Sequence, residues 1–299
     1  MTRSALAVRR QRLPAAADTL ALLKPVTWFP PMWAFMCGAV SSGAPLATNW
    51  TLLALGILLT GPMVCGASQA VNDWFDRHVD AINEPERPIP SGRIPGRWGL
   101  WIAIAGSVLS LALAGAMGPF VLGATALALA CGWAYSAPPL RLKADGWVGP
   151  AVVAFSYEGL SWFTGAALLA GAMPGAAVLA VLLLYSLGAH GIMTLNDFKA
   201  LEGDRATGVR SLPATLGPER AARIACWVMA VPQAAVVALL LRWGADWAAA
   251  AVALSLGLQI LLMRRLLRDP AGLAPWYNAT GVTLYVLGML VSAFGVRGL

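Results

Sequence analysis

Apolar residues dominate nine stretches of the chain, each about long enough to cross a membrane as a helix. The stretches cover residues 23–42, 49–71, 98–116, 118–135, 148–171, 174–196, 220–241, 246–266 and 274–296. An α-helix of about 20 apolar residues crosses a hydrocarbon core of roughly 30 Å. Pro30 and Pro31 lie inside the first stretch and are expected to kink or break it. The pattern predicts an all-α integral membrane protein.

Positive charge is concentrated in alternate connections between these stretches. Of the 21 Lys and Arg residues, all but Arg242 and Arg297 lie in or beside the N-terminal tail or the connections after the second, fourth, sixth and eighth stretches. Connections rich in Lys and Arg stay on the cytoplasmic side of a membrane. We therefore expect a cytoplasmic N-terminal tail over residues 1–22 and a single transmembrane domain over residues 23–299, with the C-terminus outside.

Composition strengthens the membrane assignment. The chain is 59% hydrophobic and 12% charged, whereas soluble domains carry roughly 25% charged residues. Its net charge of +7 belongs to one membrane face. No basic run is interleaved with aromatic residues in the way that is typical of nucleic-acid-binding segments. We therefore expect no nucleic-acid partner.

Acidic residues gather where the helix of the second stretch is expected to continue: Asn72, Asp73, Asp76 and Asp80. At 3.6 residues per turn these four positions fall within roughly a 100° arc, so their oxygens converge on one face. Carboxylates placed so closely repel one another, and Mg²⁺, which prefers oxygen ligands, relieves that repulsion. The alternative is a solvated helix end whose acids pair with Arg77 and Arg87. Three acids at this spacing favour the metal.

A second acidic cluster follows the sixth stretch and repeats the Asn-Asp pair: Asn196, Asp197, Glu202 and Asp204. Asp197 and Asp204 stand seven residues apart and share a helix face, whereas Glu202 joins them only if Gly203 unwinds the chain. Basic residues accompany both clusters: Arg77, Arg87, Lys199, Arg205 and Arg210. This combination predicts a site for a Mg²⁺-diphosphate, in which the metal bridges oxygens and the cations neutralise the remaining charge.

The segments "NDWFDRHVDAINEPERPIPSG" and "NDFKALEGDRATGVRSLPATLG" resemble the two acidic motifs of the UbiA-type intramembrane prenyltransferase family. The residues around these motifs are most similar to those of the chlorophyll and bacteriochlorophyll synthase branch, and within that branch to those of the bacterial members. The likeness covers nearly the full chain and includes "WAYSAPPLRLKADGW" between the fourth and fifth stretches.

The resemblance implies nine transmembrane helices around a central cavity, with Mg²⁺ as the cofactor. The metal ligands it implies are Asp73, Asp76, Asp80, Asp197 and Asp204, assisted by Asn72 and Glu202. The residues it implies for the diphosphate are Arg77, Arg87, Tyr135, Arg141, Lys143, Lys199, Arg205 and Arg210. The family's second motif usually carries an acid where this chain has Ala200, which leaves Asp197 and Glu202 to compensate.

The reaction implied is transfer of a geranylgeranyl or phytyl group from its diphosphate to the propionate carboxylate of (bacterio)chlorophyllide. It would occur in a bacterial inner membrane, either cytoplasmic or intracytoplasmic and photosynthetic. Two alternatives are a prenyltransferase for a quinone or haem precursor and, from another class, a secondary transporter. The transporter is disfavoured because the acids gather at helix ends and not at the bilayer midplane. A purely structural pigment scaffold would not need two carboxylate clusters.

Two ionisable residues inside apolar stretches are further candidates for the acceptor. Glu158 lies within the fifth stretch, where an ionisable side chain is a functional hypothesis by default. His190 could ligate a tetrapyrrole magnesium through a neutral imidazole, or it could be a packing histidine. Aromatic side chains facing the cavity could stabilise an allylic cation, and the candidates are Trp133, Tyr157, Trp162 and Phe163.

Overall fold

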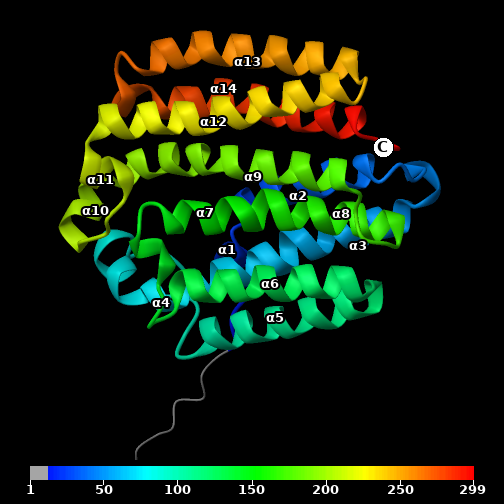
Figure 1. The fold of residues 1–299 in the computed structure, drawn as a ribbon. Coiled ribbons are helices and arrows are strands. Elements are labelled where there is room, and N and C mark those ends of the chain that lie inside the picture. The colour runs from blue at the N-terminus through cyan, green and yellow to red at the C-terminus, as the bar shows by residue number, and fades with distance from the viewer. Residues whose placement is uncertain (1–12) are drawn as a thin grey trace, which may run out of the picture.

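The computed structural model describes residues 13–299, so that most of the predicted tail, residues 1–12, lies outside the described residues. The described part is all helical and contains no β-strand, only an isolated bridge between Asp145 and Arg210. Long helices run side by side as one bundle (Figure 1). The predicted all-α class is confirmed.

Eight helical segments of the described chain are long and apolar enough to cross a membrane. They are Trp50–Asn83, Trp98–Met117, Pro119–Ser136, Val148–Ala170, Ala176–Arg205, Pro218–Arg242, Asp246–Leu266 and Pro270–Gly295. These segments coincide with the second to ninth apolar stretches. Two of them, Trp50–Asn83 and Ala176–Arg205, continue beyond the apolar residues into the acidic motifs. For the first motif, this continuation of the helix was predicted from the sequence.

The first apolar stretch is broken. It contains the end of α1 (Ala16–Leu23), the 3-10 turn η1 (Pro25–Thr27) and α2 (Phe29–Ser41). The break precedes the prolines, and Pro30 stands in the first turn of α2, where a missing N–H leaves no hydrogen bond unmade. With 13 residues, α2 is about 20 Å long at 1.5 Å per residue. Whether this short helix counts as a ninth membrane crossing stays a prediction.

The remaining elements are joined by short connections, except for the longer segment between α4 and α5. They are η2 (Leu46–Thr48), α3 (Trp50–Leu58), η3 (Leu59–Cys65), α4 (Gly66–Asn83), α5 (Trp98–Met117), α6 (Pro119–Ser136), η4 (Leu142–Ala144), α7 (Val148–Ala154), η5 (Phe155–Leu160), α8 (Ser161–Ala170), α9 (Ala176–Asn196), η6 (Asp197–Ala200), α10 (Leu201–Thr207), α11 (Leu212–Leu216), α12 (Pro218–Arg242), α13 (Asp246–Leu266) and α14 (Pro270–Gly295). Both η3 and η5 are π-helical turns inside longer helices.

Two glycines let α2 and α8 pack backbone against backbone. A Cβ atom added at Gly38 would overlap the carbonyl oxygen of Trp162, and one added at Gly165 would overlap the carbonyl oxygen of Phe35. Small residues at such crossings allow the close approach that stabilises helix pairs in a membrane. The short helix α2 is therefore held in the bundle by close packing against α8.

Several buried polar side chains in the bundle are paired across helices. The Tyr285 hydroxyl donates to the Tyr185 carbonyl oxygen at 2.6 Å, and the Tyr185 hydroxyl lies 2.9 Å from Ser292 Oγ. Gln233 and Gln259 exchange two hydrogen bonds of 3.1 and 3.0 Å between α12 and α13. Pairing is needed because an unsatisfied polar group is costly away from water.

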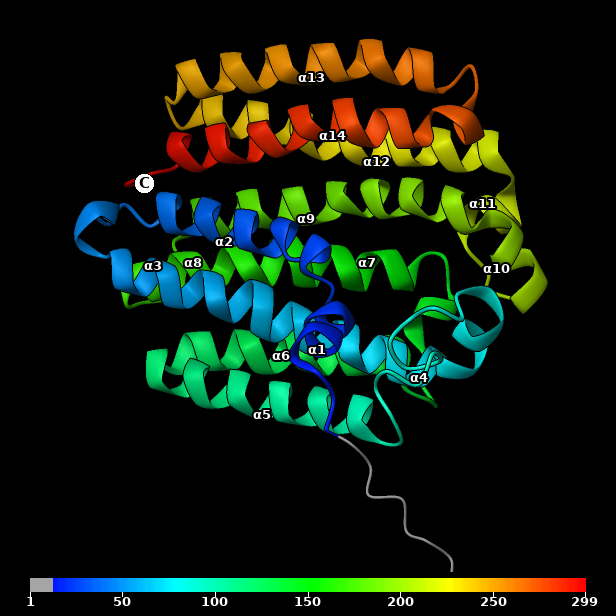
Figure 2. The same ribbon diagram turned by 180° about the vertical axis from the view of Figure 1, so that it is seen from behind.

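Both acidic motifs lie at one end of the bundle. The segments after α4, α6 and α9 meet there, and the C-terminus lies at the opposite end (Figures 1 and 2). The basic connections of the sequence are thus on one side, as the charge pattern requires for a cytoplasmic face.

We expect single cysteines to report this orientation. Ser91 and Ala47 are both exposed, in connections at opposite ends of the bundle. With a membrane-impermeant maleimide, Ser91→Cys should be labelled only from the cytoplasmic side and Ala47→Cys only from the other side. Sealed vesicles of both orientations provide the measurement. The reverse pattern would overturn the assignment of the cytoplasmic face.

Candidate active site

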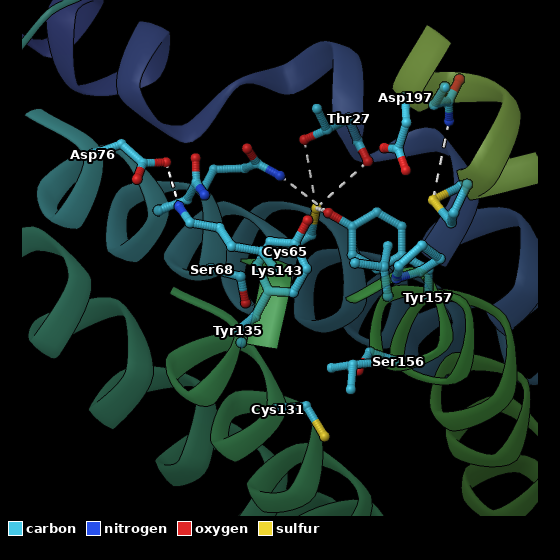
Figure 3. A pocket seen from close by; sticks show the side chains of 18 of the residues that line it. Thr27, Cys65, Ser68, Asp76, Cys131, Tyr135, Lys143, Ser156, Tyr157 and Asp197 are labelled. Atoms are coloured by element: carbon cyan, nitrogen blue, oxygen red, sulfur yellow. Dashed lines mark hydrogen bonds and ion pairs between the residues drawn. The ribbon is translucent and has the colours of Figure 1, made fainter. Parts of the chain in front are cut away.

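A cavity of about 1200 Å³ opens among α4, α6, α7, η5 and the end of α9. Figure 3 shows side chains from these elements pointing into it, with Asp76 and Asp197 entering from different helices. One part of its wall is polar and carries residues of both acidic motifs. Another part is apolar and includes Ala124, Ala128 and Leu160. A ligand with a charged head and an apolar body fits such a wall.

The first motif presents one face of α4 to this cavity. Asn72, Asp76 and Asp80 stand four residues apart and line it, as side chains at i, i+4 and i+8 of a helix do. Asp73 is turned away from that face. It is 1% exposed and is not among the described residues that line the cavity. Asp73 was predicted to be a metal ligand, but unlike the other acids it does not lie on the cavity wall.

The carboxylates of α4 are paired with cations from later segments. Asp76 binds Lys143, and Arg141 NH2 lies 3.7 Å from its Oδ1. Asp80 Oδ2 accepts from Arg87 NH1 at 2.9 Å. These partners come from the predicted diphosphate-binding residues. Each cation therefore already stands beside the acids at which a metal-bound diphosphate would lie.

Two of these cations lie in the connections between helices, and their pKa values differ in direction. Burial lowers the pKa of Lys143 below that of an ordinary lysine, although Asp76 opposes this effect. Burial also acts to lower the pKa of Arg87, but Asp73 and its other acidic neighbours outweigh burial and raise it. Arg87 is therefore a permanent positive charge.

The second motif lines the same cavity from the end of α9 onward. Asp197 and Lys199 lie on η6, and Glu202 and Asp204 on α10. The 3-10 turn and the start of a new helix at Leu201 break the straight helix that the spacing rule assumed. For that reason Glu202 reaches the cavity together with the other acids. Ala200, where the family usually has an acid, also lines the cavity.

Among the residues that the structure describes, several predicted site residues do not line the cavity. These are Asp73, Arg77, Arg205, Arg210, Glu158 and His190. The Arg77 guanidinium lies 4.2 Å from the ring centre of Trp74. His190 Nε2 lies 3.0 Å from the Trp147 carbonyl oxygen, which fits the packing alternative. Glu158 is 6% exposed, and its Oε2 has no hydrogen-bond partner in the described part of the chain.

The structure adds Gln69 and Asn278, which the sequence did not single out, as partners of two predicted residues. Tyr157 alone of the four aromatic candidates lines this cavity, and its hydroxyl accepts a 3.0 Å hydrogen bond from Gln69 Nε2. Gln69 stands three residues before Asn72 and shares its helix face, a signal that was available in the spacing. Asn196 also lines the cavity, and its Oδ1 accepts from Asn278 Nδ2 at 2.9 Å. This contact joins two segments that are far apart in the chain, so no local sequence pattern could have predicted it.

The donor set of this cavity fits Mg²⁺. Asn72, Asp76 and Asp80 from one motif and Asp197 and Asp204 from the other supply only oxygen atoms, which is the ligand type of this ion. Within the described residues, no three Asp, Glu, His or Cys side chains are close enough to enclose a metal by themselves. Mg²⁺ is usually held by one or two carboxylates together with substrate phosphates. The separated acids of this cavity match a site in which substrate phosphates supply the remaining ligands.

Comparison with known proteins agrees with the fold and the motifs. The profile of the UbiA prenyltransferase family matches residues 27–293. This chain belongs to that family. It is 58% identical to the bacteriochlorophyll synthase 33 kDa chain of Cereibacter sphaeroides, over 98% of this chain and 97% of that one. It is 39% identical to the chloroplastic chlorophyll synthase of Avena sativa, over 92% of this chain and 75% of the plant protein.

Among solved structures, a UbiA homolog from Archaeoglobus fulgidus bound to DMAPP and Mg²⁺ superposes with a TM-score of 0.73. It shares 22% identity, and the match covers 94% of this chain and 99% of the other. At that identity the likeness concerns the fold. The helical bundle of this prenyltransferase therefore has the fold of that homolog.

We expect His190→Ala to retain prenyl transfer. Because the His190 ring contacts the Trp147 carbonyl oxygen and not the cavity, kcat and KM should stay within about twofold of the wild type. Loss of the hydrogen bond should lower the free energy of unfolding by about 1 kcal/mol. Steady-state kinetics and thermal unfolding in detergent measure both quantities. Lys143→Met, which alters the cavity, should reduce kcat/KM at least tenfold; a similar loss in His190→Ala would contradict the packing role.

Proposed function

We propose that this prenyltransferase transfers a geranylgeranyl or phytyl group from its diphosphate to the propionate carboxylate of (bacterio)chlorophyllide. The cavity carries the proposal, because it joins two acidic motifs and several cations to an apolar wall. Its volume of about 1200 Å³ exceeds the roughly 300–1,000 Å³ of ordinary ligand pockets. Two bulky substrates account for that size. The acceptor is inferred from the 58% identity to a bacteriochlorophyll synthase chain.

The charged end of the cavity is suited to hold the diphosphate. Lys143, Arg141 and Arg87 stand on the side of α4, and Lys199 stands on the side of the second motif. Cations so placed bind the diphosphate oxygens and stabilise the negative charge that grows on the leaving group. Tyr135 lines the same cavity and can donate its hydroxyl proton to a diphosphate oxygen. This role is proposed for the cavity-lining members of the predicted set, and Arg77, Arg205 and Arg210 are left out.

The residues proposed to hold Mg²⁺ are the cavity-lining acids Asp76, Asp80, Asp197 and Asp204, with Asn72 and Glu202 assisting. When bound, the ion neutralises charge on the diphosphate and makes it a better leaving group. Mg²⁺ would compete with Lys143, Arg141 and Arg87 for these carboxylates, and the phosphate oxygens would offer the three cations new partners. The cations thus neutralise the acids first and the leaving group afterwards.

The apolar wall protects the reacting carbon from water. The bond between C1 of the isoprenoid and its diphosphate oxygen breaks, and its electron pair leaves with the diphosphate. A carboxylate oxygen of the acceptor then forms the new bond to C1. A propionic acid with a pKa of about 4 is already ionised at neutral pH, so no side-chain base is needed. Tyr157 offers an aromatic ring in the cavity wall for the allylic cation.

The proposed location is a bacterial inner membrane, cytoplasmic or intracytoplasmic. The charged end of the cavity would face the cytoplasm, from which the soluble diphosphate product can diffuse away. The esterified product is more apolar than its acceptor, so it would leave into the lipid. Membrane association itself follows from the eight spanning segments of the described chain.

Removal of a cavity carboxylate should abolish turnover without unfolding the protein. We expect Asp76→Asn and Asp204→Asn to lose at least 100-fold in kcat/KM, because each removes a charged oxygen from the cavity and preserves side-chain volume. Excess EDTA should abolish wild-type activity, and added Mg²⁺ should restore it. Product formation and the melting temperature are measured together. Near-wild-type activity in both variants would exclude these acids as ligands.

The acceptor is tested directly with purified protein, Mg²⁺ and geranylgeranyl diphosphate. Bacteriochlorophyllide, chlorophyllide, 4-hydroxybenzoate and a haem precursor are supplied in parallel, and products are identified by mass spectrometry. We expect esters of the two chlorophyllides and at least 100-fold slower turnover of the others. Preferential prenylation of 4-hydroxybenzoate or of the haem precursor would instead support the alternative acceptor class.

A further inference from the structure

Asp73 is held in a chain of ion pairs beside the proposed site. Its Oδ1 accepts from Lys24 Nζ at 2.6 Å and lies 3.3 Å from Arg87 NH1. Its Oδ2 is buried without a hydrogen-bond partner in the described part of the chain. Lys24 was not singled out in the sequence, where it stands as an isolated charge at the start of an apolar stretch. Two cations converge on this carboxylate, so they supply the neutralisation that a metal would otherwise provide.

Arg87 connects Asp73 with the cavity. The same NH1 atom that approaches Asp73 donates to Asp80 Oδ2 at 2.9 Å, and Nε binds Glu84. The Arg87 side chain is 24% exposed and lines the cavity, whereas the Asp73 side chain is 1% exposed and does not. Asp73 thus lies behind Arg87 as seen from the cavity. Without it, the guanidinium would lose one of the contacts that fix its direction.

Lys24 is in turn held by the packing of α1 on α4. Leu22, one residue before the end of α1, is fully buried in a cluster with Ala70 and Val71 of α4. At the other end of α1, Asp18 Oδ1 accepts from Arg93 NH1 at 2.7 Å. The Lys24 backbone is left-handed, with φ of 48°, an uncommon conformation for a residue with a side chain. It turns the chain from α1 into η1 and places the ammonium against Asp73.

We propose that Asp73 is a positioning residue for Arg87 and that Lys24 holds Asp73, so the docking of α1 orients the arginine that binds the diphosphate. The proposal gives Asp73 a different role from its neighbours in the motif, which face the cavity. It also gives the segment before the first long helix a part in substrate binding. The inference rests on the proposed function, in which Arg87 contacts the diphosphate.

The test compares Asp73→Asn with Asp76→Asn and Arg87→Met. In Asp73→Asn we expect the KM for the isoprenoid diphosphate to rise at least tenfold, with kcat changed less than threefold. The Mg²⁺ concentration for half-maximal activity should stay within about twofold of the wild type. Arg87→Met should raise the KM at least as much and should also lower kcat, because it removes a charge that stabilises the leaving group. The double variant should be no worse than Arg87→Met alone, because both substitutions remove one function.

Lys24 supplies the matched control. Lys24→Met should raise the KM as Asp73→Asn does, and Lys24→Arg, which keeps the charge, should restore it to within about threefold of the wild type. Hydrogen exchange at residues 16–24 should become faster in Asp73→Asn and Lys24→Met but not in Asp76→Asn. This readout follows the docking of α1 directly. If Asp73→Asn does not fold, the two lysine variants still decide.

Binding of inorganic diphosphate with Mg²⁺, measured by calorimetry, separates this inference from the proposed function. We expect at least tenfold weaker binding in Asp73→Asn, Lys24→Met and Arg87→Met. Abolished turnover in Asp73→Asn together with a raised Mg²⁺ requirement would make Asp73 a metal ligand and overturn the inference. Wild-type kinetics and diphosphate binding in Asp73→Asn would also overturn it. A wild-type protein that binds diphosphate but esterifies no acceptor would refute only the proposed reaction.

Discussion

Neutralisation of carboxylates at the end of α4 is the interaction on which the arrangement of the site depends. Charges removed from bulk water are costly unless each has a partner. The partners come from elsewhere in the chain: Lys24 from the end of α1, Arg87 from the turn after α4, and Arg141 and Lys143 from the segment after α6. Each ion pair therefore fixes a loop as well as a charge. The loops around the cavity are ordered by the acids that the chemistry uses.

The membrane imposes the second constraint. A chain in lipid must satisfy its backbone within helices, so a large polar cavity is possible only between helices that are themselves well packed. The close approach at Gly38 and Gly165 and the paired tyrosines of α9 and α14 provide that packing away from the charged end. Close helix packing therefore stabilises the bundle away from the site, and ion pairs stabilise the charged end.

Much of the fold could be predicted from the sequence, and most of the predicted site residues line the cavity. Apolar length located eight spanning segments, and spacing placed Asn72, Asp76 and Asp80 on one face. Spacing did not separate Asp73 from them, because a 100° arc is wide enough to include a side chain that turns behind a neighbour. The break that brings Glu202 to the cavity lies at η6, and not at Gly203 as we had expected, because Gly203 is inside α10. Lys24 and Asn278 act through partners 49 and 82 residues away in the chain, and such pairs leave no local signal.

The π-helical turn η3 determines which way the first motif faces. It lies between α3 and α4 within one continuous helical segment, so its wider turn sets the rotation of α4 relative to α3. If η3 were an α-helical stretch of the same seven residues, Asn72, Asp76 and Asp80 would be rotated about the helix axis, because each residue of an α-helix turns the chain by about 100° and each residue of a π-helix turns it by less. The acids would then no longer face the cavity. The number of residues in this apolar segment therefore matters to the site as much as the chemical nature of their side chains.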